Sequence, residues 1–253
     1  TANNSSIAIY GKESSTLTNS GTGKITTSGT SSVGILANSS TVSNATGGEI
    51  TTSGTGSAGI YGITNSTIEN SGNITTEETG SAGIYAKNST GTRANSVVTN
   101  SGIINVAKET SAGILGEKSE ITNSGTGSNG IELTAKKTAG VIGNNDSKVT
   151  NSGRIETKTA TPGSASEGLV GISLNASTGN NDASGTITLG TAYSTGMYGV
   201  AKSILTNDGT INGNKQNAVG IATKASTATN TGTITLSAID STGMFGLTVG
   251  SDK

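Results

Sequence analysis

Hydrophobic residues occur along this chain in short groups at a regular spacing, separated by polar turns. One group reads small–Gly–apolar–aromatic or aliphatic, as at residues 58–61 and 82–85, and its ten copies follow in steps of 23 to 31 residues. A second group, apolar–x–Asn–Ser–Gly with an isoleucine after it, lies between successive copies, as at residues 68–74 and 149–155. Nine copies of the second group interleave with ten of the first. Two motifs that stay in phase over the whole chain indicate a repeat architecture.

Each repeat contains three apolar segments that are too short, and too rich in Gly, Asn and Ser, to be helices. The first segment alternates Ala58, Ile60 and Gly62 on one face, which is the period of a strand. Ile68 and Ile74 mark the other two segments. Three strands per repeat predict an all-β fold, a right-handed three-sided parallel β-helix of about ten coils of 23–31 residues. We expect one domain over residues 1–253.

The composition supports a solenoid rather than a globular core. Hydrophobic residues make up 30% of the chain, aromatic residues 2% and charged residues 12%, and there are 39 glycines. Globular domains contain about 45–50% apolar residues. A narrow solenoid buries only about one side chain per short strand, so this low content suffices. We expect isoleucine and valine inside, and serine and threonine on the wet outer face.

Several classes of function are excluded by residue type. The chain has no histidine and no cysteine, which removes Ser-His-Asp and Cys-His catalysis, Cys/His zinc sites, haem, iron–sulfur clusters and disulfides. A net charge of −1 gives little support for binding nucleic acid. No apolar run of about 18 residues exists, so this segment is not expected to insert into a membrane.

The charged residues give no catalytic constellation in the sequence. Lysine and arginine scatter singly apart from Lys136 and Lys137, and the carboxylates are equally dispersed. Glu77 and Glu78 are the one adjacent acidic pair, on a predicted turn. Enzymes that cleave polysaccharides need two or three converging carboxylates or a metal site. We therefore expect no enzyme activity, no cofactor and no metal.

Asparagine forms the most regular polar column of the repeat. We interpret it as structural, because asparagine tolerates the left-handed geometry of a tight bend and its amides can hydrogen-bond along a column. Its predicted members are Asn19, Asn44, Asn70, Asn100, Asn123, Asn151, Asn207 and Asn230, with Ala183 as the exception.

Candidate receptor contacts lie at two kinds of position. The residue after the inward isoleucine is predicted to face outward, and its column contains four of the five tyrosines and the one phenylalanine. Such a column is either an interaction stripe or a self-stacking ladder, and an inverted register with these side chains inside is the further alternative. Two long coils carry insertions near residues 88–96 and 157–167, at different corners. The candidates are Tyr61, Tyr85, Arg93, Lys158, Pro162, Tyr198 and Phe245.

The motifs resemble a known family. Ser-Ala-Gly-Ile-Tyr at residues 57–61 and 81–85, and Thr-Asn-Ser-Gly at 99–102, 122–125 and 150–153, are similar to the passenger region of large fusobacterial-type autotransporter adhesins of the monomeric kind. The resemblance extends over essentially the whole chain. It implies a secreted virulence protein displayed on the bacterial outer membrane, which acts as a monomer and binds host cells or other bacteria through glycan or protein receptors.

The resemblance leaves two functions open. The chain shows no terminal amphipathic strands of a membrane barrel and no polar caps, so we expect a fragment of a longer passenger. The first function is an adhesin segment that itself contacts a receptor. The alternative is a purely structural stalk that displays a distal binding tip.

Overall fold

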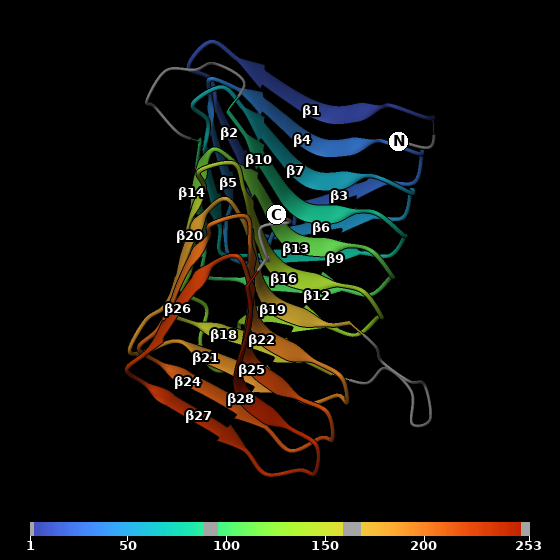
Figure 1. Ribbon diagram of the computed structural model, residues 1–253. Helices are drawn as coiled ribbons and strands as arrows, with labels where there is room; N and C mark the ends of the chain where they lie inside the picture. The colour runs from blue at the N-terminus through green and yellow to red at the C-terminus, as the bar shows by residue number, and fades with distance from the viewer. Residues whose placement is uncertain (1–2, 89–95, 159–167, 249–253) are drawn as a thin grey trace.

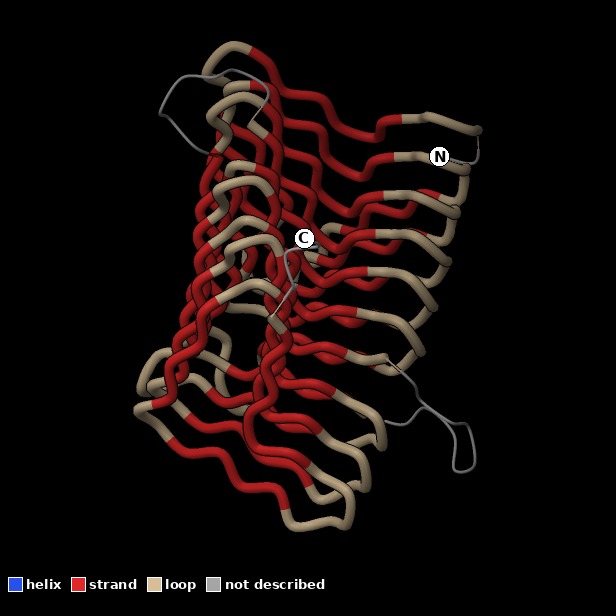
Figure 2. The backbone as a smooth tube through the Cα atoms, viewed as in Figure 1, coloured by secondary structure: helices blue, strands red, loops and turns tan. Residues whose placement is uncertain are grey.

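The computed structural model describes residues 3–88, 96–158 and 168–248 (Figure 1). In this part of the chain every regular element is a β-strand, and the strands wind into a three-sided parallel β-helix (Figure 2). Sheet A has ten strands, and sheets B and C have nine each. The predicted fold is therefore confirmed, as nine coils of three strands with a tenth strand in sheet A.

The strands of each sheet follow one another in the order of the coils. Sheet A consists of β1 (Ile7–Lys12), β4 (Val33–Asn38), β7 (Ala58–Ile63), β10 (Ala82–Lys87), β13 (Ala112–Glu117), β16 (Ala139–Asn144), β19 (Val170–Asn175), β22 (Thr195–Val200), β25 (Val219–Lys224) and β28 (Thr242–Leu247). Sheet B consists of β2 (Thr16–Asn19), β5 (Thr41–Asn44), β8 (Thr67–Asn70), β11 (Ser96–Asn100), β14 (Ser119–Asn123), β17 (Lys148–Asn151), β20 (Thr178–Asn181), β23 (Ile204–Asn207) and β26 (Thr227–Asn230). Sheet C consists of β3 (Lys24–Thr27), β6 (Glu49–Thr52), β9 (Asn73–Thr76), β12 (Ile103–Val106), β15 (Gly130–Leu133), β18 (Arg154–Thr157), β21 (Thr186–Leu189), β24 (Thr210–Gly213) and β27 (Thr233–Leu236).

The core is a set of aliphatic columns that run along the axis of the solenoid. Ile60, Ile84 and Ile114 pair in register across β7, β10 and β13, and all three are fully buried. Within one coil, Ile84 of sheet A is joined in the core by Val98 of sheet B and Ile104 of sheet C. The predicted inward isoleucines are confirmed. Each coil buries its apolar side chains against the coils before and after it, so stability depends on stacking.

The glycine of the sheet A motif is required by the close approach of sheets A and C. A Cβ atom on Gly83 would lie 2.7 Å from the carbonyl oxygen of Gly113 and 2.7 Å from Cγ2 of Ile104. Real Cβ atoms essentially never come this close to such atoms. The same geometry holds for Gly59, which meets Gly83 and a sheet C isoleucine.

The asparagine column is a continuous amide ladder inside the solenoid. From Asn19 to Asn230, each Nδ2 donates to the Oδ1 of the next coil at 2.7–2.8 Å. The expected exception at Ala183 is wrong, because Asn181 holds that place at the end of β20. The left-handed geometry is also wrong, since the members of the column end sheet B strands and none has a positive φ.

Serine forms two further internal columns, which corrects the expectation that serine and threonine lie outside. At the corner between sheets C and A, the backbone N–H of Ser57 donates to the hydroxyl of Ser81 at 3.3 Å, and that of Ser81 donates to Ser111 at 3.1 Å. At the corner between sheets A and B, Ser119 donates to Ser147 in the same way at 3.2 Å. These buried hydroxyls satisfy backbone groups where the sheets are interrupted.

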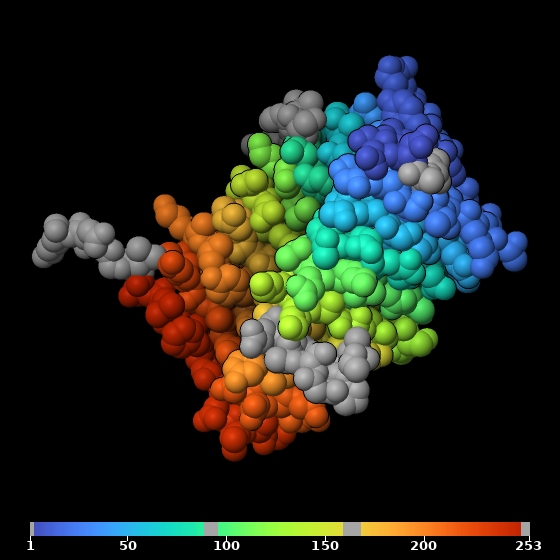
Figure 3. All heavy atoms as spheres, turned by 90° about the vertical axis from the view of Figure 1, so that its right-hand side faces the viewer, coloured from blue at the N-terminus to red at the C-terminus, as the bar shows by residue number. Residues whose placement is uncertain are grey.

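The outer surface follows the stacking of the coils. In the space-filling view the coils succeed one another in chain order, from blue to red (Figure 3). The first long insertion lies between β10 of sheet A and β11 of sheet B, and the second lies between β18 of sheet C and β19 of sheet A, so the flanking strands differ as predicted. Residues 89–95 and 159–167, which make up most of the two insertions, lie outside the described residues. Within the described ranges there is no helix that could cross a membrane.

Candidate functional site

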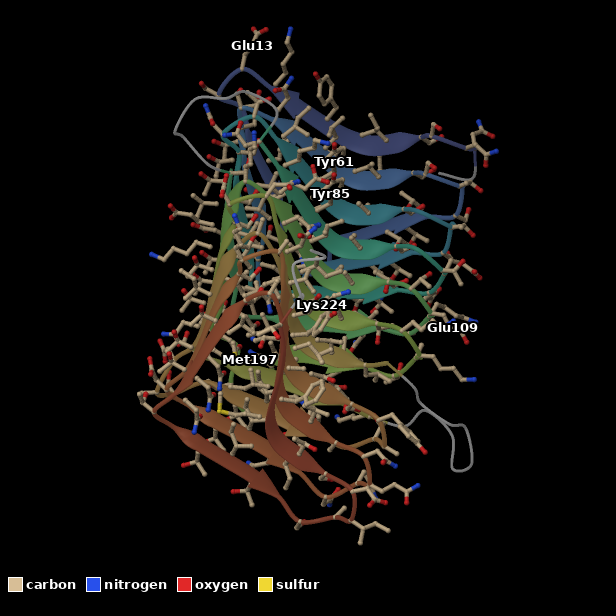
Figure 4. The ribbon with its side chains drawn as sticks, in the orientation of Figure 1. Glu13, Tyr61, Tyr85, Glu109, Met197 and Lys224 are labelled. Atoms are coloured by element: carbon tan, nitrogen blue, oxygen red, sulfur yellow. The ribbon has the colours of Figure 1, made fainter. Side chains whose placement is uncertain are left out.

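The aromatic column on sheet A faces outward, as predicted. Ile60 and Ile84 are fully buried, whereas Tyr61 and Tyr85 are partly exposed on the opposite face of the same strands. The two tyrosines lie one below the other on neighbouring strands (Figure 4). This excludes the inverted register.

The two tyrosine rings stack on each other. Their centroids are 4.7 Å apart and their planes differ by 2°. In the pairing of the strands, Leu36 precedes Tyr61 and Leu115 follows Tyr85. Since each ring therefore has a neighbour of the column on both sides, mainly ring edges are left for solvent. This arrangement favours the self-stacking ladder.

A short polar network anchors the end of this tyrosine pair. The hydroxyl of Tyr85 donates to Oε1 of Glu117 at 2.8 Å, and Nζ of Lys87 lies 3.0 Å from Oε2 of the same carboxylate. Burial and the bond to Glu117 raise the pKa of Tyr85 well above its ordinary value. Burial alone would raise the pKa of Glu117, but the hydrogen bonds from Lys87 and Tyr85 outweigh it and lower that pKa.

The other predicted contact residues do not join this pair. Tyr198 lies in the same column on β22, with three strands between it and β10. Phe245 is 50% exposed on β28, where no described strand follows in sheet A. Lys158 directly follows β18, a strand of sheet C. Arg93 and Pro162 lie outside the described residues.

Sheet C carries a charged cluster that was not anticipated from the sequence. Nη2 of Arg154 lies 2.6 Å from Oε1 of Glu132, and Nη1 pairs with Glu156. Nζ of Lys158 lies 2.8 Å from Glu132 and 3.3 Å from Glu156. The expectation of singly scattered charges is wrong here. Glu132 and Glu156 directly follow inward isoleucines in successive coils and pair in register, and that equivalence was the available signal.

This cluster is held firmly in place. The Arg154 side chain also donates to the backbone carbonyls of Asn129 at 3.2 Å and Ser128 at 3.1 Å. Burial opposes ionisation of Glu132, yet hydrogen bonds from Lys158 and Arg154 outweigh it and lower its pKa. The hydrogen bond to Glu132 raises the pKa of Lys158. Two cations therefore neutralise two carboxylates within the cluster.

The fold and the two side-chain clusters of the outer surface indicate the class of protein more directly than they indicate an activity. The described residues contain no group of three or more Asp or Glu side chains placed to hold a metal ion. What they show is a long parallel β-solenoid with an aromatic ladder on one face and a balanced charge cluster on another.

Comparison with known proteins places this solenoid in a family. Residues 1–128 and 117–252 each match the family model of the BigA third pectate lyase-like domain. The chain therefore belongs to this family, and it spans two successive matches that overlap at residues 117–128. The family is a β-helix-like domain of a bacterial surface protein, which agrees with the passenger-like β-helix expected from the sequence. No curated protein and no solved structure matches the chain.

Proposed function

We propose that this chain is a passenger segment of an autotransporter adhesin, displayed outside the bacterial outer membrane. It attaches the bacterium to host cells or to other bacteria through a glycan or protein receptor. The unbroken solenoid is the observation that carries the proposal. Nine coils at the usual strand spacing form a rod roughly 40–45 Å long with three extended faces. Membership in a family of bacterial surface domains supports the location.

Binding rather than catalysis is the proposed activity of these faces. Glu132 and Glu156 are held by Arg154 and Lys158, and Glu117 is held by Lys87. A carboxylate whose oxygens are engaged by cations is a poor general base or nucleophile, and the lowered pKa values of Glu117 and Glu132 weaken these two as bases. We propose a monomer as the acting form, and a role in virulence where the bound cell is a host cell.

The alternative function is a stalk that holds a distal tip away from the cell. The stacking of Tyr61 on Tyr85 favours it, because ring faces that cover each other are not available to a receptor. A stalk also requires little more than strands that pair continuously from coil to coil, which the solenoid has.

Two attachment measurements separate these functions. Beads coated with the purified chain are incubated with host cells and with partner bacteria, using a Tyr61→Ser/Tyr85→Ser variant in parallel. In the longer protein that carries this segment, residues 59–82 are deleted, which removes one whole coil and keeps the motif in phase. Attachment of the isolated chain supports the adhesin. The stalk function is supported if beads coated with the isolated chain attach no better than bare beads, and if the longer protein attaches fully after the coil is deleted.

A further inference from the structure

A groove crosses the outer face of sheet C over its last strands. A hollow of about 450 Å³ is lined by Glu156, Thr188, Asn212 and Thr235, which lie on β18, β21, β24 and β27, and by Lys215 beyond β24. A second hollow, of about 290 Å³, extends toward the corner with sheet B and includes Arg154. Both hollows include Thr188, so together they form one track across the sheet.

The two ends of this track differ in chemistry. At the Arg154 end, the side chains are fixed by the ion pairs of the charged cluster. Along the other end, Thr188, Asn212 and Thr235 present one hydroxyl or amide per coil. Within the described ranges none of these three side chains hydrogen-bonds to another protein group, so their donors and acceptors are directed to solvent.

The spacing of these polar groups suits an extended, hydroxyl-rich chain. Neighbouring strands in a sheet lie about 4.7–4.9 Å apart, so Thr188, Asn212 and Thr235 repeat at that interval. An extended glycan advances by a similar length with each sugar residue and offers hydroxyls at every step. Hydroxyl and amide side chains are the usual partners of such groups.

The charges and the backbone exclude other macromolecules from this groove. Arg154 and Lys158 are neutralised by Glu132 and Glu156, which leaves Lys215 as the one lysine or arginine lining the groove without an ion pair within the described ranges. A polyanion such as nucleic acid needs several cations along its length, so it gains little from this single charge. A peptide added as a strand needs a free sheet edge, whereas this groove lies on a face whose backbone groups are already paired.

We infer that the sheet C groove binds a neutral, linear glycan, with Thr188, Asn212 and Thr235 hydrogen-bonding to successive sugar residues. Glu156, already fixed by Arg154, accepts from a sugar hydroxyl at one end of the chain. The inference rests on the proposed attachment function and names the receptor chemistry and the face that recognises it.

The test compares two triple variants on an array of neutral and acidic glycans. Thr188→Val, Asn212→Val and Thr235→Val remove the hydrogen-bonding groups of the groove and keep residues that favour strands. The matched control, Thr122→Val, Thr150→Val and Thr206→Val, makes the same kind of change on the outer face of sheet B. Circular dichroism and melting temperature establish that both variants fold.

The expected result is binding of a neutral linear glycan that falls about tenfold or more in the sheet C variant and is unchanged in the sheet B control. Equal binding by both variants, a preference for acidic glycans, or no glycan binding by the native chain would overturn the inference. Cell attachment is measured on the same samples. Attachment that persists in the sheet C variant contradicts the groove as the site of attachment and leaves the adhesin function standing. Glycan binding without any cell attachment contradicts the adhesin function and leaves the glycan groove standing.

Discussion

The side-chain amide of Asn151 donates to Oδ1 of Asn181 at 2.7 Å, and Asn181 donates in turn to Asn207 at 2.7 Å. All three side chains are buried, so no water replaces a missing partner. The ladder is therefore continuous through the coil whose sequence departs most from the repeat. A buried polar column of this kind stabilises only while every member is paired.

Replacing Asn181 by alanine breaks the ladder between Asn151 and Asn207. We expect a loss of about 1–3 kcal/mol in the free energy of unfolding, because Asn151 and Asn207 each lose a buried partner. The control is Asn180→Thr, which places the residue type of Thr150 and Thr206 at the adjacent outward position. Oδ1 of Asn180 is buried without a partner, so this change is expected to cost less than about 0.5 kcal/mol. Equal unfolding midpoints in urea for the two variants would show that the ladder contributes nothing.

The glycine column gives a second prediction. Gly83→Ala pushes a methyl group against Gly113 and Ile104, and we expect a cost of about 1–3 kcal/mol from the strain. Gly243 occupies the same place in β28, but a Cβ atom added there would meet nothing within 4 Å, so Gly243→Ala is the matched control. Thermal unfolding checks both variants. A native melting temperature for Gly83→Ala would contradict the close approach of sheets A and C.

The partly buried hydrogen bond from Tyr85 to Glu117 predicts an unusual alkaline titration. Burial and the bond to Glu117 raise the pKa of Tyr85 above the ordinary value of 10.0. The stabilisation is complete below that value and is lost as the pH rises through the higher pKa of the folded state. Burial also raises the pKa of Tyr61, so absorbance of tyrosinate, followed against pH, is expected to show two late steps, the last of which disappears in Tyr85→Phe. A last step that is unchanged in Tyr85→Phe would show that another tyrosine gives rise to it.

The charged cluster of sheet C predicts that the stability of the folded protein falls at acid pH. The pKa of Glu132 lies below its ordinary value of 4.5, so its contribution is present above that value and is lost as the pH falls through the lowered pKa. We expect Glu132→Gln to lower the melting temperature at about pH 7 and to lower it less at about pH 3. Glu120→Gln on β14 is the control, because Glu120 makes no ion pair within the described ranges. An effect of Glu132→Gln that is the same at both pH values would contradict the cluster.

The part of the fold that repeats could be predicted from the sequence. Ile60 and Tyr61 alternate in and out as expected, because a strand has a side-chain period of two and only one face can be buried. The error at Ala183 has a physical origin. Two extra residues separate Asn181 from the glycine that follows, and aligning the motif on that glycine moved the asparagine out of register.

The features that depend on contacts between coils were harder to predict. Glu132 and Arg154 are 22 residues apart in the chain, and only the register of β15 against β18 brings them together. The buried serine columns were missed for a similar reason. Serine is a polar residue, and its polarity alone suggests an exposed position. It is buried here because backbone N–H groups of the neighbouring coil need a hydrogen-bond acceptor at each corner.

The central claim is that each coil is held by stacking on its two neighbours, and Ile84→Asp tests it most directly. A carboxylate in this fully buried position has no partner and is expected to open its coil at a cost of several kcal/mol. Hydrogen–deuterium exchange, resolved by peptide, is the measurement. We expect protection to fall in β10 and, to a lesser degree, in β7 and β13, while β22 and β25 keep native protection. A loss confined to β10, or an equal loss along the whole chain, would contradict the account.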